Sequence, residues 1–89
     1  MTAFDVRVEV TLRHGISDPQ GATVERALPA LGFTGVREVG VGKSIRFTLD
    51  AASEDDARAQ VQDMCDRFLT NPVIEDAHIE LTAVAAVNG

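Results

Sequence analysis

The sequence predicts an α+β domain of two layers, a mostly antiparallel sheet with two helices on one face, in the order βαββαβ. Some segments alternate strictly between apolar and polar residues, and two others repeat apolar residues at helical spacing. Each segment therefore has one apolar side, which a sheet and its helices bury against each other. A chain of 89 residues has room for one such domain, expected over residues 1–84, with 85–89 as a frayed C-terminal tail.

The first third of the chain predicts a strand and then a helix. Apolar residues occupy alternate positions over residues 4–12, as in a half-buried strand. Asp18 and Pro19 mark a helix start, because Asp caps free backbone amides and Pro at the first position has no amide to leave unpaired. The helix is expected to end at Gly32, a residue typical of C-terminal caps. Pro29 lies near that end and predicts a kink or an early tightening.

A hairpin is expected in the middle of the chain. Residues 36–41 predict a second strand, and the spacing of its valines breaks the period of two and indicates a bulge. Gly42 and Lys43 fit a two-residue turn with glycine first. Apolar residues at alternate positions over 45–49 then predict a third strand.

The last third predicts a helix and a final strand. Ser53 caps the helix, and the acidic residues 54–56 suit its positive end. Asn71 and Pro72 end it, and residues 77–83 alternate as a strand. One apolar stripe of the helix is expected to contain Ala57, Val61, Met64, Cys65 and Phe68.

Composition excludes several classes of function. The chain is 45% hydrophobic and 25% charged, with a net charge of −6, so its field repels the phosphates of nucleic acid. A single cysteine excludes an internal disulfide and suits a reducing compartment, so we expect a cytoplasmic protein. The N-terminus has no apolar run, and no membrane association is expected.

No group of residues makes a convincing catalytic or metal site. Cys65 is expected in the helix core, where a thiol stays protonated. His14 and His78 lack the spacing of metal ligands, and the acidic run 54–56 is explained by its helix start. The glycines and lysine of residues 40–43 join two strands, whereas a phosphate-binding loop joins a strand to a helix. We therefore expect neither catalytic nor metal-ligating residues.

Three segments together resemble one family. HGISDPQGATVERALPALGF, VREVGVGKSIRF and MCDRFLTNPVIEDAHIEL are similar in order and spacing to the PurS subunit of phosphoribosylformylglycinamidine (FGAM) synthase. The resemblance covers about residues 6–81 and implies a PurS-like fold with ferredoxin-like element order. This sequence departs from the family pattern at His14, where the family usually has proline, and at Pro29 in the first helix.

The resemblance implies a non-catalytic subunit of an enzyme of purine biosynthesis. The whole synthase converts formylglycinamide ribonucleotide, glutamine and ATP to formylglycinamidine ribonucleotide. The PurQ glutaminase and the PurL synthetase are the implied partners, and this subunit would join them and support ammonia transfer. It would itself bind no cofactor, since ATP, Mg and glutamine are used by the partner subunits. A homodimer or higher homo-oligomer is also expected, because a core this small gains from shared surface.

Three exposed segments form the expected partner-binding surface. Lys43 is the only lysine of an acidic chain, and Gly21 and Gly42 leave room for another backbone. Gly21 also costs helix stability, about 1 kcal/mol relative to alanine, which indicates close approach of another backbone. The alternative to a bridging subunit is a small-molecule-sensing regulatory domain of similar topology. The candidate residues are Asp18, Pro19, Gln20, Gly21, Gly42, Lys43, Asn71 and Pro72.

Overall fold

A computed structural model describes residues 1–84, so the expected C-terminal tail, 85–89, lies outside the described residues. Three strands form one antiparallel sheet in the order β2-β1-β3. The strands are β1 (Thr2–Leu12), β2 (Lys43–Ala51) and β3 (Glu75–Ala83). The α+β class predicted from the sequence is confirmed. No helix among residues 1–84 is long and apolar enough to cross a membrane.

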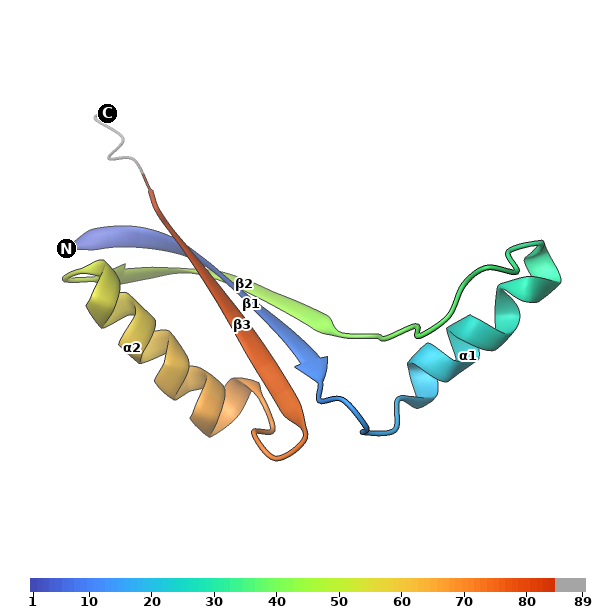
Figure 1. The fold of residues 1–89 in the computed structure, drawn as a ribbon. Coiled ribbons are helices and arrows are strands. Elements are labelled where there is room, and N and C mark those ends of the chain that lie inside the picture. The colour runs from blue at the N-terminus through green and yellow to red at the C-terminus, as the bar shows by residue number, and fades with distance from the viewer. Residues whose placement is uncertain (85–89) are drawn as a thin grey trace.

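The core lies on one face of this sheet, which we call the inner face. Directly paired residues of antiparallel strands share a face, so the alternation of β1 places Val6 and Val8 beside apolar residues of both neighbours. Helix α2 (Glu54–Met64) packs there (Figure 1). The buried residues are Phe4, Val6, Val8, Val10, Ala51, Ala57, Val61 and Cys65.

Helix α2 begins as predicted but ends differently. The Ser53 hydroxyl accepts a hydrogen bond from the Asp56 amide at 3.1 Å, which caps the helix. A π-helical turn, η2 (Cys65–Leu69), follows and changes the angle between successive side chains. Phe68 is consequently 87% exposed, so its predicted place on the buried stripe is wrong.

Helix α1 (Pro19–Ala27) ends early, as Pro29 predicted. A 3₁₀ turn, η1 (Pro29–Leu31), replaces its last turn, and Gly32 ends it with φ of +96°. Proline lacks the amide needed to continue the α-helical pattern, which explains the tightening.

The predicted second strand at residues 36–41 is wrong, and so is the turn at Gly42 and Lys43. Acidic side chains of the α1 region accept hydrogen bonds from the backbone amides of residues 36–41. Val39 N donates to Glu25 Oε1 and Val41 N donates to Asp18 Oδ2, each at 2.9 Å. Those amides are unavailable to a sheet. Lys43 is instead the first residue of β2 and pairs with Val10.

Residues 13–42 form an arm that leaves the sheet at the end of β1 and returns to the start of β2. Figure 1 shows α1 at the outer end of this arm, well apart from α2. The prediction that both helices cover one face is therefore wrong within a single chain. Hydrogen bonds from the Val39 and Val41 amides to Glu25 and Asp18 tie α1 to the returning side of the arm.

Candidate partner-binding surface

The base of the arm is organised around Asp18. Its Oδ1 accepts a hydrogen bond from the Gly21 amide and its Oδ2 accepts one from the Val41 amide, both at 2.9 Å. One carboxylate therefore caps α1 and ties the helix to the returning chain. The Val41 bond, followed by the Gly21 bond, holds the pKa of the Asp18 carboxyl below its usual value.

Gly21 has the close backbone neighbour that the sequence predicted. It is the buried residue of α1, and a Cβ atom at this position would overlap the Val39 carbonyl oxygen. Gly42 has a comparable constraint, since a Cβ atom there would lie 2.5 Å from the Val10 carbonyl oxygen. The two glycines serve contacts inside the chain, and Gly21 is too deeply buried to touch a partner.

A hollow of about 420 Å³ opens where the arm meets the inner face. Five of the eight candidate residues line it: Asp18, Pro19, Gln20, Gly42 and Lys43. Val10, Leu12, Val41 and Glu75 complete the lining. Val10, Leu12 and Val41 are its more buried, apolar part, which we call the floor, and Gln20 and Lys43 are exposed polar residues of its rim. The structure thus joins two of the three predicted segments into one concave surface.

The third predicted segment lies beside this hollow without lining it. Asn71 N donates to Glu75 Oε1 at 2.7 Å, and Glu75 N donates to Asn71 O at 2.8 Å. Pro72 is exposed in the same turn. Glu75 therefore connects the turn to the hollow. Glu75 and Glu25 were not among the predicted site residues, because nothing in their spacing marked them and only the folded arm reveals their contacts.

Lys43 is the basic group of this hollow. It makes no ion pair within 4.0 Å with any residue from 1 to 84. The Asp18 carboxylate already accepts two backbone hydrogen bonds, so it is partly satisfied without a cation. The Lys43 ammonium group can therefore receive an anionic side chain from outside the chain.

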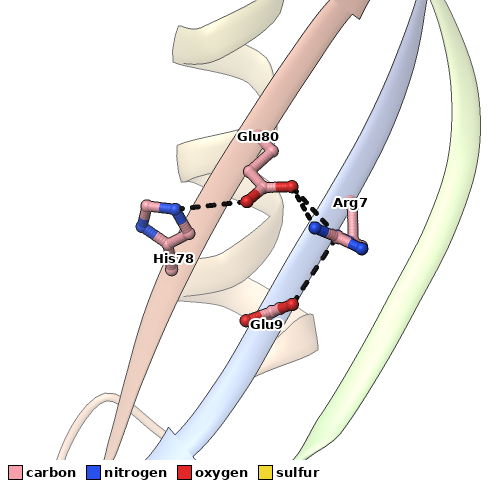
Figure 2. A network of polar contacts seen from close by, with 4 residues as sticks. All are labelled: Arg7, Glu9, His78 and Glu80. Atoms are coloured by element: carbon pink, nitrogen blue, oxygen red, sulfur yellow. Dashed lines mark hydrogen bonds and ion pairs between the residues drawn. The ribbon is translucent and has the colours of Figure 1, made fainter.

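The opposite face of the sheet is polar, as the alternation predicted. Figure 2 shows Arg7 between Glu80 and Glu9, with His78 on the other side of Glu80. Arg7 Nε donates to Glu80 Oε2 at 3.0 Å. All four side chains are substantially exposed, and such pairs contribute little stability. This cluster is a solvated sheet face with no geometry of a reactive centre.

Cys65 lies in the core, as predicted, with 1% of its surface exposed. Burial, followed by the charge of Asp66, raises the pKa of its thiol, so the thiolate needed of a nucleophile is disfavoured. Over the described part of the chain, no three His, Cys, Asp or Glu side chains are grouped to hold a metal ion.

Replacing Cys65 with alanine is expected to leave the activity of a complex reconstituted with this chain unchanged. It should cost about 1–2 kcal/mol of unfolding free energy, the effect of a small buried cavity. Chemical denaturation and steady-state assays measure the two quantities. Selective loss of turnover in a folded C65A variant would contradict the core assignment.

Comparison with known proteins identifies the family. The family model described as PurS, phosphoribosylformylglycinamidine (FGAM) synthase, matches residues 5–83. The chain belongs to the PurS family. A Synechocystis PurS subunit of phosphoribosylformylglycinamidine synthase is 43% identical over 82 residues, which are 92% of this chain and 82% of that protein.

Solved PurS structures agree with this fold. The Methanocaldococcus jannaschii PurS structure matches with a TM-score of 0.82 and 34% identity, covering 92% of this chain and 99% of that one. A chain in the structure of PurLQS from Thermotoga maritima matches with a TM-score of 0.84 and 30% identity, covering 92% and 100%. These relatives favour a synthase subunit over the small-molecule sensor.

Proposed function

We propose that this chain is the non-catalytic bridging subunit of FGAM synthase in purine biosynthesis. It joins the PurQ glutaminase to the PurL synthetase and supports transfer of ammonia between them. The observation that carries the proposal is the match to the PurLQS chain over its entire length. The buried thiol also supports it, because the only cysteine of the chain cannot serve as the glutaminase nucleophile.

A bridge has a physical purpose in this reaction. Ammonia released into neutral water becomes ammonium, which is not a nucleophile, and it diffuses away. Holding the glutaminase beside the synthetase keeps the effective concentration of ammonia high at the second site. In this proposal the subunit holds no ATP, Mg or glutamine, which belong to its partners, and it acts in the cytoplasm as a homodimer or higher homo-oligomer.

The hollow at the base of the arm is the proposed contact with PurL. Its apolar floor and Lys43, which forms no ion pair with residues 1–84, fit an apolar side chain next to a carboxylate of the synthetase. Asn71 and Pro72 extend this contact at the adjacent turn. Gly21 keeps an internal role, since it is buried under Val39.

The proposal is tested by co-purification. Tagged chain, mixed with PurL and PurQ of the same organism plus glutamine and ADP, is expected to retain both partners through size-exclusion chromatography. The isolated chain is expected to show neither glutaminase nor ligase activity. Failure to retain either partner, or robust turnover by the chain alone, would overturn the bridging role.

A further inference from the structure

A subunit that joins two enzymes needs two contact surfaces that do not overlap. The hollow at the base of the arm, which is the proposed contact with PurL, opens where the arm meets the inner face. PurQ must bind elsewhere on the chain if both partners are held together. The PurQ contact, whose existence rests on the proposed bridging function, is therefore expected on another face.

A second hollow, of about 580 Å³, lies on the face of the sheet opposite the core, which we call the outer face. The strand register arranges its polar side chains in two adjacent rows, one centred on Asp5 and one centred on Arg7. Burial does not explain these residues, because they point away from the core. They are Asp5, Arg7, Arg46, Thr48, Glu80 and Thr82.

Two arginines occupy directly opposite positions in this hollow. Arg7 of β1 pairs with Arg46 of β2, and like charges at such positions destabilise a sheet. Arg7 is compensated by ion pairs with Glu80 and Glu9. Arg46 makes no ion pair within 4.0 Å with any residue from 1 to 84. Arg46 is therefore unfavourable for the isolated fold, and its guanidinium group is free to bind an anionic group.

The carboxylates of the outer-face hollow already have partners. Glu80 Oε2 accepts hydrogen bonds from both Nε and Nη2 of Arg7. Asp5 Oδ1 accepts one from the Thr48 hydroxyl at 3.3 Å. An arginine binds a carboxylate through two parallel hydrogen bonds, so a carboxylate from another protein fits Arg46.

The surroundings of Arg46 also restrict the kind of partner. Asp5 and Glu80 repel a surface that is acidic throughout. The surface that binds here therefore presents one carboxylate among neutral or basic side chains. Such a mixed pattern gives specificity, because a wrongly placed acidic group meets a carboxylate instead of the arginine.

We propose that PurQ binds the outer face of the sheet and that one of its carboxylates forms a salt bridge with Arg46. The chain then holds PurL at the base of the arm and PurQ on the outer face, so the two partners do not compete for one surface. The salt bridge also accounts for Arg46, whose charge the fold itself does not need.

Arg46→Glu tests this contact without loss of the fold. The substitution places a carboxylate opposite Arg7, so the unfolding midpoint should be no lower than that of wild type. PurQ is titrated onto tagged chain in the presence of PurL, glutamine and ADP. R46E is expected to bind PurQ about tenfold more weakly than wild type while retaining PurL. Arg46→Lys keeps the charge without the paired hydrogen bonds and should fall between the two.

Arg58→Glu is the matched control. Arg58 is exposed on α2 and has its own partner, Glu54, so its reversal changes the net charge equally but away from the outer face. R58E is expected to bind PurQ as wild type does. Wild-type PurQ binding by R46E, or equal weakening by R46E and R58E, would overturn the outer-face contact. Loss of PurQ from the wild-type complex would instead overturn the bridging role, so the two failures are distinguishable.

Discussion

Replacing Gly21 with alanine is expected to destabilise the protein, the opposite of the usual effect in a helix. Alanine ordinarily stabilises a helix interior by about 1 kcal/mol relative to glycine. Here the added Cβ atom would overlap the Val39 carbonyl oxygen, which is backbone and cannot rotate away. Overpacking of this kind costs about 1–3 kcal/mol. The returning side of the arm should separate from α1 and lose the hydrogen bonds to Asp18 and Glu25.

Gly35 supplies the matched control. A Cβ atom at Gly35 meets nothing within 4 Å, and the residue has no positive φ, so Gly35→Ala should leave stability within about 0.5 kcal/mol of wild type. Denaturant unfolding gives the two free energies, and hydrogen exchange at the Val39 and Val41 amides reports the arm directly. Greater stability in G21A than in wild type would contradict this account of the arm.

Lys43→Glu is expected to weaken PurL binding about tenfold, equivalent to about 1.4 kcal/mol. The substitution places a third carboxylate beside those of Asp18 and Glu75 in the hollow and repels the acidic group proposed to enter it. Glutamine-dependent turnover should fall more than turnover fed by ammonium salt. The ammonium route needs the synthetase alone, while the glutamine route needs the subunits to be joined.

Arg46→Glu is the control for this charge reversal. Arg46 lies on the same strand but on the polar outer face, opposite Arg7. R46E and wild type are expected to bind PurL equally, and K43E should retain the self-association of wild type. Equal weakening by K43E and R46E would show a general charge effect, and unchanged binding by K43E would remove the hollow from the PurL contact.

The sequence predicted the elements whose pattern reflects burial. Strict alternation identified β1 and β3, while Ser53 and Asp18 identified two helix starts that the structure confirms. Pro29 predicted the early end of α1, and the unexplained Gly21 predicted a close backbone. These features depend on local chemistry, which a single sequence contains.

The errors arose where contacts between distant residues decide the structure. Residues 36–41 resemble a strand, but the carboxylates of Asp18 and Glu25 take the Val41 and Val39 amides. Nothing in the apolar–polar pattern of residues 36–41 indicates that these amides donate to side chains instead of to a neighbouring strand. The apolar side of α1 was expected to pack on the sheet of its own chain, but Val24 and Leu31 are exposed, and periodicity alone cannot tell which surface an amphipathic helix contacts. Of the residues that line the hollow, the sequence indicated Asp18, Pro19, Gln20, Gly42 and Lys43 but not Glu75.

The central claim, that this subunit couples the glutaminase to the synthetase, is tested most directly by comparing two nitrogen donors. FGAM formation by PurL and PurQ is measured with glutamine and with ammonium salt, each with and without this chain. The account predicts that adding the chain raises glutamine-dependent turnover strongly and ammonium-dependent turnover little. Glutamine-dependent turnover that is the same with and without the chain would contradict it.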